Sequence, residues 1–208
     1  MVGLILYIRF TNRNNSQLDT AFSFLNSITD VSEETFIELQ KVSELKKVEA
    51  GTQIVKINEI PTKAYLLVSG VIRCYLSTES GKEFNKSFYL PISVVASLTA
   101  MLNKTASIFT FEALTDCELY EIDYAKVMAI CDKDIRVNKL YSKVLEEVYI
   151  KYERRLVELI SLDSKDRYLE LRKQIPNVDE LIPQYHIASY LGITPVQLSR
   201  IRKKIGIH

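Results

Sequence analysis

The residue types best suited to binding chemistry gather at the carboxyl end of the chain. From Pro183 to His208 the sequence has no Asp or Glu, and it carries the basic residues Arg200, Arg202, Lys203 and Lys204. The whole chain of 208 residues has a formal net charge of only +1, so this positive charge is local. Cations held near phosphates release condensed counterions, and a basic end on a nearly neutral protein therefore indicates a polyanion partner. A solvated, frayed terminus would have the same composition, and charge alone leaves both interpretations open.

Two short helices joined by a tight turn are predicted in this end. The first spans Gln184–Leu191, and Gly192 supplies the left-handed residue that a tight turn after a helix needs. Thr194 can cap the second helix, with Pro195 at its first position and Gln197 three residues after the cap, which is the pattern of a capping box. This is the helix-turn-helix arrangement, whose second helix enters the major groove of DNA.

The second of these helices is predicted to have one apolar and one polar face. Leu198 and Ile201 lie three residues apart and are expected to face the interior. The opposite face carries Val196, Gln197, Ser199, Arg200 and Lys203. Base edges in the major groove are distinguished by hydrogen bonds, and an arginine can bridge two acceptors of guanine. Any two-helix corner can have a glycine at its turn, so DNA binding is predicted by the motif together with the lack of acidic residues.

Other residue types that carry chemistry are too scattered for a metal centre or an active site. Cys74, Cys117 and Cys131 have no C-x-x-C spacing, which fits a reducing cytoplasm and supplies neither a disulfide framework nor a zinc site. The two histidines, His186 and His208, both lie near the carboxyl end. The sequence has no nucleophile–base pair, no phosphate loop and no dinucleotide fingerprint. We therefore expect a protein that is not an enzyme and has no cofactor and no metal.

The predicted secondary structure that must position the basic end changes along the chain. Residues 18–42 are predicted to be helical, with Ser32 at the start of a helix. From Lys46 to Asp123 the sequence changes to short β-rich runs with turn residues between them. These runs are Gln53–Ile57, Ala64–Val68, Val71–Ser77, Glu83–Tyr89, Ile108–Ala113 and Glu118–Ile122. Strands at roughly ten-residue spacing indicate a small antiparallel roll or barrel rather than a parallel sheet.

The longest periodic segment predicts a helix from Ile135 to Ile160. Its apolar residues recur at steps of three and four, at Val137, Tyr141, Val144, Val148, Tyr152, Leu156 and Leu159. A helix of about 26 residues is about 39 Å long, too long to be covered by one small roll. We therefore expect Tyr141, Val144, Val148 and Tyr152 to pair with a second copy in a two-fold dimer. A helix packed wholly within its own chain is the alternative.

These patterns divide the chain into three parts. Residues 1–134 are predicted to form N-terminal helices and a sensor-like roll, 135–160 the dimerisation helix, and 161–208 the DNA-binding domain. In the last part we expect a helix over Lys165–Gln174 and a loop over Pro176–Glu180. The apolar stretch Met1–Phe10 is far below the roughly 20 residues that span a bilayer, and it lacks the features of a signal peptide. We expect no membrane association and a cytoplasmic protein. Whether these first ten residues belong to the native protein stays open.

The order of these elements resembles the Crp/Fnr family of transcription regulators. Residues 187–195 (IASYLGITP) and 198–203 (LSRIRK) are similar to the Bacteroidetes-type branch, and 66–75 (LLVSGVIRCY) resembles a strand-turn-strand of the family's sensor roll. The resemblance implies an α+β fold with an eight-stranded, cyclic-nucleotide-binding-like jelly roll, a long dimer helix and a winged helix-turn-helix. It also implies a homodimeric, sequence-specific regulator that binds double-stranded DNA, with RNA polymerase as a further partner. Four residues follow Lys204, so we expect any wing to come from residues before the motif or to be absent.

The resemblance also assigns roles to residues of the helix-turn-helix. The base-facing positions would be Val196, Gln197 and Arg200. The phosphate-facing positions would be Gln184, Thr194, Ser199, Lys203 and Lys204. Family members often carry Glu where this chain has Val196, and the loss of that acceptor favours an apolar contact, such as a thymine methyl, over a contact with cytosine.

The roll departs from family members that bind cyclic nucleotides. Those members have a Gly-Glu pair for the ribose and an Arg followed by Ser or Thr for the cyclic phosphate. Here Val95-Ala96 and Ile108 stand at about these positions, and no Arg occurs between Arg73 and Arg136. A buried phosphate without a paired cation and several donors is costly, so we expect neither cyclic AMP nor cyclic GMP to bind.

A small-molecule effector of another kind remains an alternative for the roll. Lys104 is the cation between Leu90 and Glu112, and it forms a candidate effector pocket with Ser97, Thr99 and Ser107. The simpler interpretation, that these residues only fill the roll, is favoured over any named ligand, and an apolar small molecule or no ligand at all remains open. A different function is a ligand-binding signalling module whose C-terminal helices contact protein rather than DNA. DNA binding that falls steeply with salt would separate the two functions. The operator, the effector and the direction of regulation cannot be read from the sequence.

Overall fold

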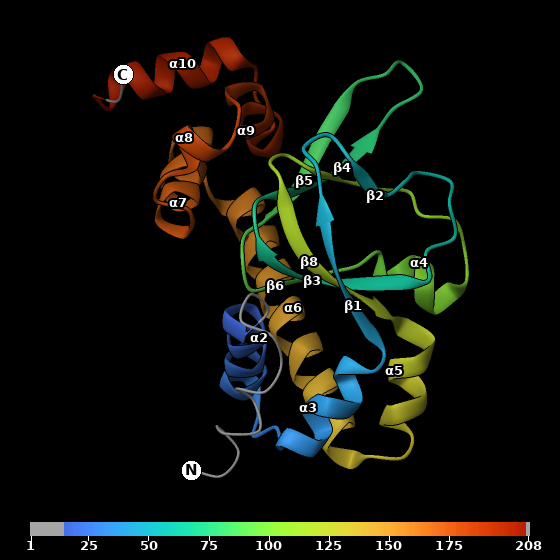
Figure 1. Cartoon of the computed structure of the whole chain (residues 1–208). Helices are drawn as coiled ribbons and strands as arrows, with labels where there is room; N and C mark the ends of the chain where they lie inside the picture. The colour runs from blue at the N-terminus through green and yellow to red at the C-terminus, as the bar shows by residue number, and fades with distance from the viewer. Residues whose placement is uncertain (1–14, 207–208) are drawn as a thin grey trace.

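The computed structural model describes residues 15–206 of the chain, with side chains described from Ala21 onward, residue 24 excepted. The stretch Met1–Phe10, whose role was left open above, lies outside the described residues. Figure 1 shows a β-roll with helices at both ends and one long helix running beside it. Within the described residues no helix is both long enough and apolar enough to cross a bilayer.

The roll consists of two four-stranded antiparallel sheets. One has the order β1-β8-β3-β6 and the other β2-β7-β4-β5. The strands are β1 (Ser43–Val48), β2 (Gln53–Val55), β3 (Lys63–Ser69), β4 (Ile72–Ser77), β5 (Glu83–Tyr89), β6 (Ser93–Val95), β7 (Thr110–Ala113) and β8 (Cys117–Asp123). The predicted antiparallel roll is therefore confirmed, and the eight strands agree with the resemblance.

The sequence patterns missed two strands and placed some strand ends wrongly. Strand β1 has the sequence SELKKV, in which charged residues mask the alternation, and it pairs on one side only, with β8. Edge strands commonly carry such charges because lysine and glutamate discourage pairing with other chains. Strand β6 has three residues, too few for a periodic signal. The predicted runs Gln53–Ile57 and Ile108–Ala113 are each shorter in the structure, as β2 and β7.

The core of the roll lies between the two sheets. Buried side chains from both sheets meet there, among them Leu67, Ile72, Val95, Phe111 and Leu119. The turn from β3 to β4 requires a glycine, because Gly70 has a φ of +92° and an added Cβ would lie 2.5 Å from the carbonyl oxygen of residue 116. The Ser-Gly turn is thus held against the neighbouring loop.

Helices close the lower end of the roll in Figure 1. They are α2 (Asn15–Ile28), α3 (Glu33–Gln40), α5 (Tyr124–Cys131) and the first turns of α6 (Ile135–Ser161), while α4 (Leu98–Asn103) lies higher, beside the roll. Ser32 caps α3 by accepting a hydrogen bond from the backbone N–H of Thr35, as predicted. A separate apolar cluster forms where α2 and α3 meet the roll and α6, with Leu66, Tyr120 and Leu140 at its centre.

The carboxyl end forms a small helical body. It comprises α7 (Ser164–Gln174), α8 (Val178–Leu181), α9 (Gln184–Leu191) and α10 (Pro195–Lys204). The loop predicted over Pro176–Glu180 is wrong, because α8 begins inside it and the Val178 side chain is fully buried in the core of the body. The described residues 162–206 contain helices and no strand, so no β-wing is formed by them.

Candidate nucleic-acid interface

Helices α9 and α10 form the predicted corner. Gly192 ends α9 with a φ of +71°, in the left-handed region. Thr194 caps α10: its hydroxyl accepts from the backbone N–H of Gln197 at 3.2 Å, and its own N–H donates to Oε1 of Gln197 at 2.8 Å. With Pro195 at the first position, the predicted capping box is confirmed in both directions. The start of α10 is therefore rigidly defined.

The two faces of α10 differ as the sequence predicted. Leu198 is completely buried and Ile201 is half-buried against the helical body, while Val196 is 60% exposed. The exposed face also includes Gln197, Ser199, Arg200, Lys203 and Lys204. Arg202 differs from these residues, because its guanidinium lies 3.8 Å from the carboxylate of Asp179 and its side chain is 19% exposed. The outer surface of α10 is therefore polar and basic even though one of its arginines points back to α8.

The candidate base-reading residue Gln197 is partly engaged within the chain. Its Oε1 accepts hydrogen bonds from the backbone N–H and from the hydroxyl of Thr194. The amide nitrogen of the side chain keeps two donors, while the oxygen is held by the cap. In this arrangement Gln197 can donate to an acceptor on a base, but it cannot also accept from an adenine amino group without opening the capping box.

The candidate phosphate-binding residues lie at both helices. Gln184 is half-buried at the first position of α9, and Ser199 is exposed on α10. Lys203 and Lys204 are exposed in the last turn of α10. The hydroxyl of Thr194 and the N–H of Gln197 are occupied by the cap, and Pro195 has no N–H, so the backbone N–H of Val196 is the one that a phosphate at this helix end would meet.

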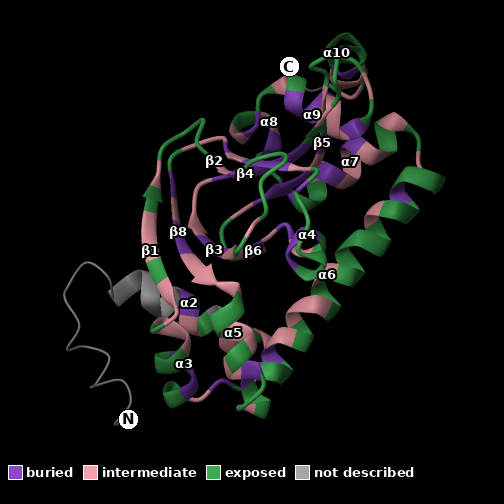
Figure 2. Ribbon diagram, turned by 90° about the vertical axis from the view of Figure 1, so that its right-hand side faces the viewer, coloured by how far each residue is buried: buried purple, intermediate pink, exposed green. Residues whose placement is uncertain are grey.

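The long helix α6 has a large exposed apolar surface in its second half. Figure 2 shows this half largely exposed, whereas buried patches occur near the start of α6. Tyr149, Leu156 and Ile160 are 65%, 57% and 77% exposed, and at spacings of seven and four residues they share one face of the helix. Tyr152, Val157 and Leu159 are also exposed and widen this face. We call the exposed residues Tyr149, Tyr152, Leu156, Val157, Leu159 and Ile160 the apolar stripe.

The four residues expected to form the dimer contact do not share one environment. The hydroxyl groups of Tyr141 and Tyr124 lie 3.0 Å apart within the chain. Val144 packs against the apolar cluster of α2 and α3, and Val148 is half-buried beside the roll. Tyr152 is exposed and belongs to the apolar stripe. The first two therefore have partners inside their own chain.

A cavity of about 1090 Å³ lies between the roll and α6, and it extends toward α2 and α7. Of the candidate effector residues, Ser97 and Thr99 line it. Ser107 is buried with its hydroxyl 2.8 Å from that of Ser97, and Lys104 is exposed in a left-handed conformation at the end of α4. The structure thus brings the two serines together and directs Lys104 elsewhere.

Two lysines that the sequence analysis did not single out line this cavity. The ammonium of Lys86 lies 4.2 Å from the ring centre of Phe109 and 4.9 Å from that of Tyr152. Lys151 lies 5.2 Å from the ring centre of Tyr89. The Lys86–Tyr152 and Lys151–Tyr89 pairs join β5 to α6, and the Lys86–Phe109 pair joins β5 to the residue that precedes β7. Because each partner is distant in sequence, no spacing pattern could have predicted them.

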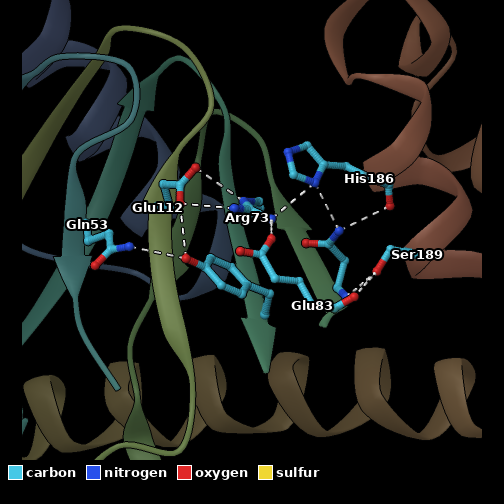
Figure 3. A network of polar contacts seen from close by, with 8 residues as sticks. Gln53, Arg73, Glu83, Glu112, His186 and Ser189 are labelled. Atoms are coloured by element: carbon cyan, nitrogen blue, oxygen red, sulfur yellow. Dashed lines mark hydrogen bonds and ion pairs between the residues drawn. The ribbon is translucent and has the colours of Figure 1, made fainter. Parts of the chain in front are cut away.

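The helix-turn-helix contacts the roll through a buried polar network (Figure 3). Arg73 of β4 is paired with Glu83 and, at 3.0 Å, with Glu112. Its guanidinium also lies 3.1 Å from Nδ1 of His186 on α9. Ser189, one turn later on α9, accepts from the N–H of Asn85 and donates to the carbonyl of Glu83, both at 2.9 Å. Sequence reasoning considered His186 only as a metal ligand and did not find this contact.

The surroundings of His186 favour the neutral ring. Burial, followed by the nearby Arg73 guanidinium, lowers the pKa of His186 from 6.5 to about 4, although Glu83 and Glu112 oppose this shift. A guanidinium only donates hydrogen bonds, so Nδ1 must be the acceptor and the ring proton must lie on Nε2. His186 is therefore neutral at pH 7.

Comparisons with known proteins agree with this architecture. Residues 45–134 match the family described as cyclic nucleotide-binding domain. No curated protein sequence matches the chain. Among solved structures, the c-di-GMP-responsive global regulator CLP of Xanthomonas campestris has a TM-score of 0.67 at 15% identity, with 84% of this chain and 92% of that chain covered.

Two further solved structures have the same fold. FixK2 of Bradyrhizobium japonicum has a TM-score of 0.65 at 19% identity, over 79% of this chain and 85% of that one. A transcriptional regulator of the Crp/Fnr family from Eubacterium rectale has a TM-score of 0.66 at 17% identity, over 85% of this chain and 84% of that one. Residues 45–134 thus match the cyclic nucleotide-binding domain model, and the chain has the overall fold seen in a Crp/Fnr-family transcription regulator.

Proposed function

We propose that this protein is a homodimeric, sequence-specific DNA-binding regulator of transcription in which α10 reads the major groove. One observation carries the proposal: α10 buries Leu198 in the helical body and exposes an acid-free face with Arg200 and Lys203. Within the described residues, no ion pair engages Arg200, so its guanidinium is available to a ligand. A capped, polar and basic helix surface suits base edges and phosphates.

The residues of α10 would divide the work of recognition. Arg200 would bridge the two acceptors of a guanine, and Val196 would contact a thymine methyl. Gln197 would donate from its amide nitrogen while its oxygen stays in the capping box. Lys203 and Lys204, together with Gln184 and Ser199, would hold the backbone through its phosphates, and Thr194 would define the helix end that approaches one of them.

A second copy of the chain would complete the DNA-binding unit. Helix-turn-helix dimers bind two half-sites about one helical turn apart, which requires a fixed spacing of their recognition helices. The apolar stripe of α6 supports this arrangement, because an exposed row of Tyr149, Leu156 and Ile160 is costly in water and suits the same row of a second α6. RNA polymerase is the partner through which such a dimer would affect transcription.

The roll would respond to something other than cyclic AMP or cyclic GMP. Where family members that bind these nucleotides have an arginine for the phosphate, Ile108 stands here and is 62% exposed. The cavity is instead lined by Lys86 and Lys151, each held over aromatic rings, and by the apolar residues of α4. These surroundings are suited to an effector with apolar surface.

Selection of bound duplexes from a random pool tests the DNA-binding function. The unaltered protein is expected to enrich a two-fold symmetric site, and binding should fall steeply as salt rises. The Arg200→Ala variant should lose the preference at one base pair of each half-site. Lys133→Ala, which removes an exposed charge near the start of α6, is the matched control. If no duplex is retained at any salt concentration, the C-terminal helices contact another partner and the proposal fails.

A further inference from the structure

The contact between α9 and the roll has a composition that is unusual for a purely structural junction. His186 is 4% exposed and Arg73 is 4% exposed, so the ring and the guanidinium meet away from water. Their nitrogen atoms lie 3.1 Å apart. Asn85 of β5 approaches the same ring nitrogen at 3.3 Å and donates to the backbone carbonyl of His186 at 3.2 Å. Every group directed at Nδ1 is therefore a donor.

This geometry is stable in only one protonation state of the ring. A neutral His186 accepts from Nη1 of Arg73, which also donates to Glu83, while Nε and Nη2 of Arg73 donate to Glu112. A protonated ring would place two cations in contact inside the protein and turn Nδ1 into a donor facing donors. The buried Oδ1 of Asn85 has no hydrogen-bond partner among the described residues, and Nδ2, a donor, is the atom of this amide that approaches Nδ1 of His186.

Three charged groups affect the protonation of the His186 ring, and they come from three strands of the roll. Arg73 lies on β4, Glu83 on β5 and Glu112 on β7, and the ring of Tyr185 on α9 lies with its centre 4.0 Å from that of His186. Both carboxylates accept hydrogen bonds from Arg73, and no hydrogen bond drawn in Figure 3 joins either of them to the ring of His186. They favour protonation, but burial and the guanidinium outweigh them.

We propose that His186, Arg73 and Asn85 form a latch that fixes the orientation of the helix-turn-helix on the roll, closed while His186 is neutral and opened when it is protonated. The latch is the titratable part of the junction, since the hydrogen bonds of Ser189 to the Asn85 N–H and the Glu83 carbonyl do not depend on the protonation of His186. The apolar part, in which Phe88 and Tyr190 lie with ring centres 5.3 Å apart, does not titrate in this range. His186 and Arg73 are thus positioning residues for α10. Their effect on DNA rests on the proposed function, whereas the latch itself does not.

The sign of the pH effect follows from the lowered pKa of His186. In a free helix-turn-helix the ring would titrate near 6.5, and in the closed latch near 4. The closed state is therefore fully favoured above about pH 6.5 and loses this advantage as the pH falls toward 4. At neutral pH the latch is closed, and it responds to acid or to a change in the position of Arg73.

Two measurements test the latch without DNA. In a His208→Gln background, His186 supplies the remaining imidazole signal in NMR spectra, because the chain has two histidines. Its midpoint is expected near 4, and an ordinary midpoint near 6.5 would overturn the proposal. The second measurement is the distance distribution between labels on Glu49→Cys in the roll and Lys204→Cys on α10, both at exposed positions.

Matched variants separate the latch from general acid unfolding. His186→Gln keeps an acceptor for Arg73 but does not titrate, and it should retain one narrow distance population from pH 7.5 to 4.5. His186→Lys places a permanent cation against Arg73 and should show a second, broader population already at pH 7.5, with helix content unchanged. The unaltered chain should match the glutamine variant at pH 7.5 and move toward the lysine variant at pH 4.5.

The failure of the latch and the failure of DNA binding can be told apart. If all three chains have the same distance distribution at each pH, the latch is wrong even where DNA binds. If the distances follow the expected order but no chain binds a duplex, the proposed function is wrong and the latch stands. Broadening of the glutamine variant together with the unaltered chain in acid would also overturn the latch, since acid would then act elsewhere.

Discussion

Helices α6 and α10 each bury one face in their own chain and expose the other, but the exposed faces have opposite character. Toward its carboxyl end α6 exposes Tyr149, Leu156 and Ile160. Helix α10 exposes Arg200 and Lys203 with a rigid cap at its start. Water solvates the second surface well and the first poorly. The difference fits the two proposed partners: an apolar surface of a second copy for α6, and a polyanion for α10.

The two ends of α6 also differ from each other in how far they are buried. Near its start Val137 and Leu140 are buried under the N-terminal helices and the roll. Beyond Val148 the stripe residues Tyr149, Leu156 and Ile160 stay mostly exposed among the described residues. The part of α6 that the proposed second copy would cover is therefore its carboxyl half, displaced along the helix from Tyr141 and Val144, two of the residues that the sequence pattern put in the contact.

The largest expected effect is the loss of the dimer when the apolar stripe is made polar. Leu156→Ser with Ile160→Ser removes two large side chains per subunit, each contributing ~1.5–3 kcal/mol when buried. Since a two-fold interface contains both copies, the dissociation constant should rise on the order of 1000-fold or more. Sedimentation should show monomers with unchanged helix content.

The matched control for this pair is Glu147→Ser, an exposed polar position on the same helix, which should leave the dimer intact. Val144→Ser should affect the stability of the subunit rather than the dimer contact. Because Val144 packs within its own chain, this change should lower the free energy of unfolding of the subunit. A dimer that survives the Leu156 and Ile160 changes would show that the stripe faces something else.

The next effect concerns the exposed face of α10. Replacing Arg200 by Ala should weaken binding to the selected duplex by about 1–3 kcal/mol, or about 5- to 150-fold, and relax the sequence preference at one position. Lys204→Ala should instead weaken binding to all sequences and reduce the salt dependence. Titrations of both variants at two salt concentrations distinguish these outcomes. Equal losses on specific and random duplexes for Arg200→Ala would contradict its base-reading role.

A smaller effect is expected at the cap of α10. Thr194→Ala removes the hydroxyl that accepts from the Gln197 N–H, and helix caps of this kind contribute ~1 kcal/mol. Thr194→Ser keeps the hydroxyl and should be nearly neutral. Chemical denaturation measures both changes. If the alanine variant is as stable as the serine variant, the capping box seen here does not stabilise the helix.

The smallest effect is predicted for the roll. Neither cyclic AMP nor cyclic GMP should change the melting temperature or the DNA affinity, because Ile108 replaces the arginine that would meet the phosphate. A ligand present at 100 times its dissociation constant would stabilise the fold by ~2.7 kcal/mol, which thermal melting detects easily. A clear upward shift with millimolar nucleotide would contradict this prediction and would place a phosphate site among Lys86 and Lys151.

Local sequence signals were sufficient to predict the two helices and the turn of the helix-turn-helix. Gly192, Thr194, Pro195 and Gln197 act within one or two turns of backbone, so their spacing predicted both the turn and the capping box that the structure contains. The division of α10 into a buried and an exposed face followed from the period of the helix in the same way. The antiparallel roll was also predictable, because turn residues punctuate its strands.

Contacts between distant residues could be found only from the folded chain. Val178 gave no helical signal, yet the core of the helical body buries it and α8 forms. Arg73 and His186 are 113 positions apart, and nothing in either segment indicates that they meet. The end of α6 that stays uncovered likewise depends on where the N-terminal helices pack. Propensity and periodicity act over a few residues, whereas burial and charge pairing depend on which surfaces the tertiary fold brings together.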